Sequence, residues 1–143
     1  MASFNWFEHF TVDLAEGVHA NALNADTDVL RVALSNTAPT PATDAVFADI
    51  TEISAGNGYT AGGDDIANAA SKSGTTITVA GTDVVFTASA GPIGPFRYVI
   101  LYNDTPADPV DPLIGYWDYG SSITLADGET FTVDFGAAVF TVG

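Results

Sequence analysis

The fold is decided by the stretch FRYVILYND, Phe96–Asp104, and its return PLIGYWD, Pro112–Asp118. The first stretch is almost wholly apolar or aromatic, is rich in Val, Ile and Tyr, and is too short for a typical helix. These properties predict a central strand that is buried on both faces. Between the two stretches, residues 105–111 contain prolines and aspartates that favour a loop. The sequence therefore predicts a long hairpin around which the other strands pack.

Alternating side chains predict further strands before and after this hairpin. Residues 29–35 place Leu30, Val32 and Leu34 on one face, and residues 131–135 alternate in the same way. Other expected strands, separated by glycine-rich turns and a bend at 90–95, cover residues 65–72, 75–79, 82–88, 122–125 and 138–142. This spacing predicts a mainly β fold, an antiparallel β-sandwich that is jelly-roll-like or an open barrel.

Two segments near the N-terminus have helical periodicity. Apolar side chains at spacings of three, four and four residues predict an amphipathic helix from Phe4 to about Ala22. This helix either covers an open end of the sheet or docks on a partner. A second set, Val46 to Ile53, predicts one short helix. We therefore divide the chain into an N-terminal amphipathic helix or arm, residues 1–22, and a β-sandwich domain, residues 23–143.

The charge balance is strongly acidic. The 143 residues include 18 aspartates and glutamates against three lysines and arginines, for a net charge of −15. A chain of this length is expected to form one domain with a real hydrophobic core. The negative electrostatic field of the chain repels phosphate backbones and anionic membranes, so we expect neither nucleic acid nor a membrane as partner. A basic protein surface or divalent cations would be attracted.

The absence of cysteine excludes disulfides and thiolate metal sites. No basic segment followed by an apolar run opens the sequence, so we expect no secretory signal. No apolar run approaches the roughly 20 residues that a membrane helix requires.

No arrangement of residues in the sequence selects an enzyme. His9 and His19 are the only imidazoles, and no ligand pattern surrounds them. No nucleophile elbow of the Gly-x-Ser-x-Gly type is present, and the glycine-rich loops lack the lysine of a phosphate loop. We therefore expect no enzyme activity and no cofactor. The acids Asp104, Asp108 and Asp111 leave calcium open, although their spacing differs from that of a calcium loop.

Two aromatic sets are candidate binding surfaces, one in the N-terminal segment and one at the end of the hairpin. Such side chains can anchor a protein partner or a sugar, and packing into the core is the alternative for both sets. The residues expected to make partner and assembly contacts are Phe4, Trp6, Phe7, Phe10, Tyr116, Trp117 and Tyr119.

The order of these features resembles a family of small virion proteins of tailed bacteriophages. The resemblance covers nearly the whole chain and rests on motifs of the fold, not on motifs of a site. After the N-terminal amphipathic segment, the matching segments are LRVALSNTAPT (Leu30–Thr40), ITEISAGNGYTAGG (Ile50–Gly63), two strands within Thr75–Ala88, YVILYND (Tyr98–Asp104), PLIGYWDYG (Pro112–Gly120) and a closing hairpin at Leu125–Phe135.

This resemblance implies a β-sandwich subunit of the virion with no catalytic residues. The expected role is that of a head decoration or cement protein on the exterior of the phage head. Its expected partners are the major capsid protein and copies of itself in a homo-oligomer. A tail, neck or fibre component of the same virion is the nearest alternative, and a carbohydrate- or calcium-binding β module is the alternative from another class.

Overall fold

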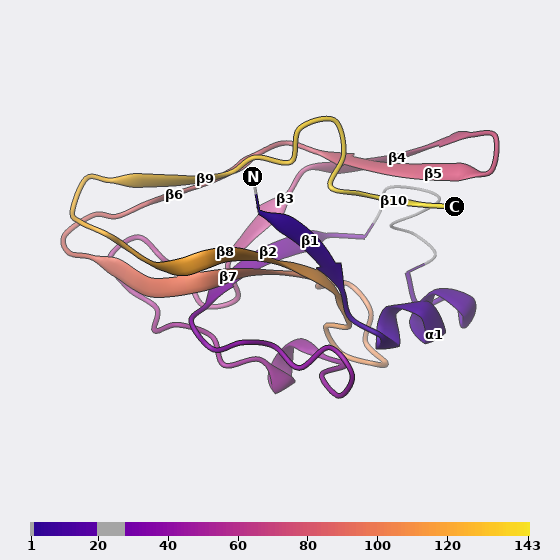
Figure 1. Ribbon diagram of the computed structural model, residues 1–143, viewed down its shortest axis with the longest axis horizontal. Coiled ribbons are helices and arrows are strands. Elements are labelled where there is room, and N and C mark those ends of the chain that lie inside the picture. Colours follow the sequence, from indigo (N-terminus) through magenta and orange to yellow (C-terminus); the bar gives the residue numbers. More distant parts are fainter. Residues whose placement is uncertain (1, 20–27) are drawn as a thin grey trace.

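A long antiparallel hairpin of β7 (Ile93–Asn103) and β8 (Leu113–Leu125) forms the centre of the computed structural model, which describes residues 2–19 and 28–143 (Figure 1). Val99 lies opposite Trp117, and Leu101 lies opposite Gly115. Every residue of β7 from Tyr98 to Asn103 is buried. The prediction of a central strand buried on both faces is therefore confirmed.

The hairpin lies within a five-stranded antiparallel sheet of order β1-β8-β7-β2-β3. Its other members are β1 (Ser3–Trp6), β2 (Leu30–Ser35) and β3 (Asp64–Ile66). The predicted strand at residues 29–35 is confirmed, because Leu30, Val32 and Leu34 enter one hydrophobic cluster while β2 pairs with β7.

Two smaller antiparallel sheets form a second layer of strands beside the hairpin (Figure 1). Their strands are β4 (Asn68–Ser73), β5 (Thr76–Gly81), β6 (Val84–Thr87), β9 (Thr130–Val133) and β10 (Phe140–Val142). One sheet has the strand order β10-β5-β4, and the other consists of β6 paired with β9. The larger hydrophobic cluster combines Leu101 and Trp117 of the central sheet with Val79, Phe86 and Phe140 of the smaller sheets. The main core therefore lies between the two layers.

The opposite face of the central sheet carries a second hydrophobic cluster. Because side chains alternate along a strand, Ile100 and Tyr102 of β7 point away from the first cluster. They pack with Phe7 and Leu113, and a 3₁₀ turn η1 (Phe47–Asp49) lies over them. The Phe47 ring stacks on Tyr102 with ring centroids 4.3 Å apart. The turn thus supplies the cover that a strand buried on both faces requires.

The structure does not show the N-terminal helix that was predicted from Phe4 to about Ala22. Ser3–Trp6 form strand β1, and helix α1 spans only His9–Ala15. Pairing of β1 with β8 prevails over the helical pattern, because it packs the Phe4 ring into the space left by the missing side chain of Gly115. A Cβ at position 115 would lie 2.2 Å from Phe4 Cζ. The end of the prediction, residues 20–22, falls outside the described residues. No helix in the described part of the chain has the length and apolar character needed to cross a membrane.

The second predicted helix is reduced to the turn η1. The Asp49 carboxylate accepts hydrogen bonds from the backbone N–H groups of Ala45 and Val46, which closes one turn. The chain then becomes extended, because the Ile53 N–H donates to the carbonyl of Leu34. Competition from the edge of β2 therefore ends the helix that the apolar spacing predicted.

Three strand boundaries also differ from the predictions. Residues 65–72 form two strands, because β3 pairs with β2 while β4 pairs with β5, so the chain passes from one layer to the other near Ala67. Residues 122–125 are the end of β8 and not a separate strand. Strand β7 begins at Ile93, within the predicted bend, and an irregularity in its register before Phe96 accommodates Gly94.

Candidate binding groove

The seven aromatic side chains expected to contact a partner differ widely in exposure. Phe7, Phe10 and Trp117 are buried, and Phe4, Tyr116 and Tyr119 are partly buried. Trp6 is 40% exposed and is the only large exposed aromatic side chain among the described residues. Core packing therefore accounts for most of the set, and Trp6 is the member that a partner can reach directly.

The aromatic residues at the end of the hairpin do not form one surface. Alternation along β8 places Tyr116 in the cluster with Phe7, whereas Trp117 and Tyr119 face the main core. Tyr119 packs edge-on against Phe131 with ring centroids 5.0 Å apart. A flat aromatic platform for a sugar is thus not assembled from Tyr116, Trp117 and Tyr119.

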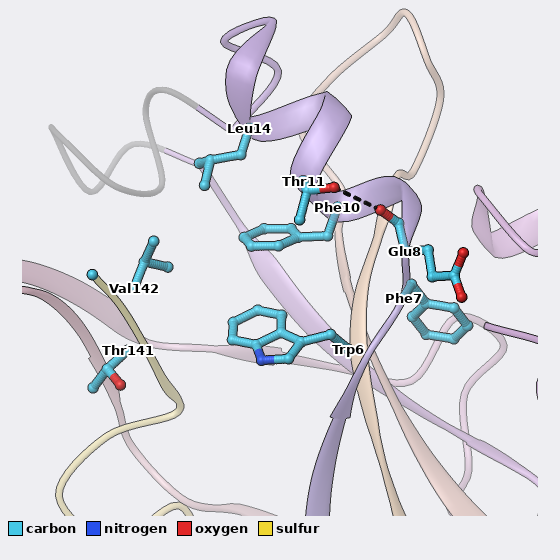
Figure 2. Close-up of a pocket in the computed structure, with 9 residues that line it drawn as sticks. Trp6, Phe7, Glu8, Phe10, Thr11, Leu14, Thr141 and Val142 are labelled. Carbon is cyan, nitrogen blue, oxygen red and sulfur yellow. Dashed lines mark hydrogen bonds between the residues drawn. The ribbon is translucent and has the colours of Figure 1, made fainter. Parts of the chain in front are cut away.

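An open groove of about 690 Å³ lies beside Trp6, between helix α1 and strand β10 (Figure 2). Its lining residues are Trp6, Phe7, Glu8, Phe10, Thr11, Leu14, Thr141, Val142 and Gly143. Figure 2 shows the stacked rings of Trp6 and Phe10 at its centre, with Leu14 of α1 and Val142 of β10 around them. The groove is therefore mostly apolar, and it is built from segments at opposite ends of the sequence.

The Trp6 side chain is fixed by three neighbouring rings. It stacks on Phe10 with centroids 4.8 Å apart and planes inclined by 18°. It also makes edge contacts with Phe4 at 4.8 Å and Phe140 at 5.5 Å. Since these contacts restrict its rotamers, little side-chain entropy remains to be lost when a ligand covers the exposed face.

The arginines of the chain are paired with acids away from this groove. Arg31 Nε lies 2.7 Å from Asp65 Oδ1, although without hydrogen-bond geometry, and its Nη2 donates to the Gly63 carbonyl at 3.0 Å. Arg97 donates two hydrogen bonds, of 2.7 and 3.0 Å, to the carboxylate of Asp118. Within the described part of the chain, no lysine or arginine lines the groove, while Glu8 is exposed at its wall.

The acidic loop proposed for calcium has a different environment. Asp104 Oδ2 lies 3.9 Å from Arg31 Nη1, and burial together with the charge of Asp104 raises the pKa of Asp111. Within residues 2–19 and 28–143, no group of three or more aspartate, glutamate, histidine or cysteine side chains is placed to hold a metal ion. The loop acids are thus balanced in part by Arg31, and calcium binding stays the alternative that the sequence left open for this loop.

A buried polar cluster joins the end of the α1 segment to strand β7. The Asn103 amide nitrogen donates to Asp28 Oδ2 at 2.8 Å and lies 3.2 Å from His19 Nδ1. Because that nitrogen carries only donors, His19 Nδ1 must be the acceptor of a neutral ring. Burial lowers the pKa of His19 to about 4, against the opposing charge of Asp28. Burial also raises the pKa of Asp13 on α1, which His9 opposes.

Sequence reasoning missed the role of Glu52. Its Oε1 accepts hydrogen bonds from the Tyr59 hydroxyl at 2.7 Å and from the Gly62 N–H at 2.6 Å. The Tyr59 oxygen in turn accepts from the Leu34 N–H of β2. The glutamate, tyrosine and glycines of the ITEISAGNGYTAGG segment therefore brace the edge of the central sheet. The sequence did contain one signal for this role: Glu52 shortly precedes a glycine turn and Tyr59.

Comparison of the chain with protein-family models, with curated proteins and with solved structures gives no match.

Proposed function

We propose that this chain is a virion structural protein of a tailed bacteriophage, acting as a head decoration or cement subunit that binds the capsid as an oligomer. In this proposal the two β layers form an open antiparallel β-sandwich. Binding is passive, through burial of apolar surface and contacts between subunits on the exterior of the head. The major capsid protein and copies of the chain are its partners.

The observation that carries the proposal is the apolar groove around Trp6 on a strongly acidic β domain. An exposed, rigidly held aromatic side chain is typical of the centre of a protein interface. A net charge of −15 disfavours contact with packaged nucleic acid and favours a basic protein lattice.

The resemblance to small phage virion proteins supplies further support. Each matching segment contributes to the framework: Leu30–Thr40 contains β2, Tyr98–Asp104 contains most of β7, and Leu125–Phe135 contains β9. The Ile50–Gly63 segment holds the Glu52 hydrogen bonds. We expect this pattern in a structural subunit, because such a subunit needs motifs that build its framework and none that build a catalytic site.

Cosedimentation of the purified protein with capsids that lack it tests the proposal, with isolated tails as the control. We expect saturable binding to heads at a fixed copy number per capsid. Binding to tails alone would move the protein to the neck, tail or fibre. Binding to neither particle would overturn the virion proposal and return attention to glycan or calcium binding.

A further inference from the structure

The groove beside Trp6 offers an apolar side chain a surface that is already formed, because its central ring is held in place by neighbouring rings. Trp6 and Phe10 form its stacked floor, and Leu14 and Val142 add aliphatic walls (Figure 2). The other large exposed hydrophobics of the described residues are valines outside the groove, such as Val12 and Val85. Trp6 thus marks a specific place on the surface and is not one of many exposed rings.

The charge around the groove selects the neighbours of that apolar side chain. Glu8 is exposed at the wall, and the chain carries an excess of 15 negative charges. Arg31 and Arg97 are engaged with acids elsewhere, and none of the described residues that line the groove is a lysine or arginine. A segment with lysine or arginine would be attracted, whereas an acidic segment would be repelled.

We propose that the groove binds a basic segment of a partner protein, which inserts an aliphatic or aromatic side chain against Trp6 and Phe10 and places a lysine or arginine beside Glu8. This inference rests on the proposed function where it identifies the partner as the capsid protein. It goes further by naming the surface and the chemistry of the segment that this surface takes.

The same charges argue against two other occupants. A two-fold contact centred on this groove would bring together the exposed Glu8 carboxylates of both copies with no lysine or arginine among the lining residues, so that repulsion opposes it. Contacts between copies in an oligomer would then use other surfaces. An anionic lipid surface is repelled for the same reason.

The first test measures cosedimentation isotherms for four variants on capsids that lack the protein. Trp6→Ala removes the exposed ring, and Glu8→Lys reverses the charge at the wall. Their matched controls are Val85→Ala, an exposed apolar residue on β6, and Glu16→Lys, an exposed acid that follows α1 outside the groove. We expect each groove variant to weaken binding at least tenfold, each control to bind as the wild type, and added salt to weaken wild-type binding.

A further variant keeps the test valid if Trp6→Ala fails to fold. Thr11→Arg retains Trp6, fills the groove from α1, and places a positive charge where the partner's cation is expected. It should also weaken binding at least tenfold, with thermal melting showing a folded protein. If wild-type protein binds heads and the folded groove variants bind equally well, the inference is overturned while the proposed function stands. If the wild-type protein binds tails instead of heads and the groove variants lose that binding, the groove is supported as the binding surface and the protein is assigned to the tail.

A second test does not depend on the virion. Acrylamide quenching reports on Trp6, because Trp117, the other tryptophan, is only 2% exposed. We expect a peptide of alternating leucine and lysine to protect Trp6 from quenching at low salt, and a leucine–glutamate peptide to give no protection. If neither particle binds and the lysine peptide gives no protection, both the proposed function and the inference fail. Concentration-dependent dimers that Trp6→Ala abolishes would assign the groove to self-association and overturn the inference.

Discussion

Replacement of His19 should remove a specific part of the acid sensitivity of the fold. The ring is 1% exposed, and its Nδ1 accepts a hydrogen bond from Asn103. Protonation would place an N–H group against the Asn103 amide, which is itself a donor held by Asp28. The folded chain therefore favours the neutral ring, in agreement with its pKa of about 4.

The size and sign of the effect follow from this shift. The pKa of His19 is about 4 in the folded chain and 6.5 in the unfolded chain, so the unfolded chain binds more protons between these values. The neutral ring of His19 makes its full contribution to the free energy of unfolding above pH 6.5, and this contribution is lost as the pH falls towards 4. The loss is about 3 kcal/mol over this interval. Asp13 acts in the opposite direction, because its raised pKa stabilises the folded chain at low pH.

Urea denaturation of wild type and His19→Gln at several pH values between 4 and 8 measures this contribution. Glutamine stays neutral and can still offer Asn103 an acceptor, so the wild type should lose about 3 kcal/mol more than the variant on going from pH 7.5 to 4. Val12→Gln is the control, because Val12 is exposed on helix α1 and its replacement changes no titratable group. The reasoning is refuted if the wild-type and His19→Gln curves run parallel.

Three further predictions concern the frame and the acidic loop. Gly63→Ala should lower the free energy of unfolding by about 3 kcal/mol or more, because at a φ of +76° the new Cβ would lie 1.8 Å from the Val32 carbonyl oxygen. Gly136→Ala is the control in the same denaturation assay: with a φ of +62° and open space around it, it should cost about 1–2 kcal/mol. Equal costs for the two variants would show that the contact with Val32 does not matter. Glu52→Ala should cost about 2–3 kcal/mol by leaving the Gly62 N–H and the Tyr59 hydroxyl without their acceptor, and Glu129→Ala at an exposed turn is the control. Calcium at millimolar concentration should leave the melting temperature unchanged, whereas a rise that saturates near one equivalent would favour a calcium site at Asp104 and its neighbours.

The sequence predicted well those elements whose own pattern agrees with their tertiary contacts. In β2, apolar side chains at every second position coincide with the face that the larger cluster buries, and in β7 the continuous apolar run coincides with burial on both faces. At Phe4 the local pattern and the tertiary contacts disagree: the helical spacing from Phe7 onwards was extended backwards, but pairing of β1 with β8 offered more burial. Boundaries set by a distant strand cannot be read from the local sequence.

The candidate site was predicted only in part for the same reason. An aromatic-rich N-terminal segment drew attention to Trp6, but the apolar spacing of Phe7 and Phe10 left open whether they cover the sheet or contact a partner; the structure buries both. The groove also needs Val142, which lies more than a hundred residues away in the sequence and lines the groove because β10 pairs with β5. Glu52 was missed because its partners are a backbone N–H and a hydroxyl, which leave no apolar pattern.

The position of β7 in two hydrophobic clusters has a consequence for how the molecule opens. Between Tyr98 and Tyr102, Val99 and Leu101 belong to one cluster, and Tyr98, Ile100 and Tyr102 belong to the other. Neither cluster can be dismantled without exposing one face of the same strand, so the two are linked through a common backbone. We therefore expect a single cooperative unfolding transition, with the amide hydrogens of Tyr98–Asn103 among the last in the protein to exchange with solvent.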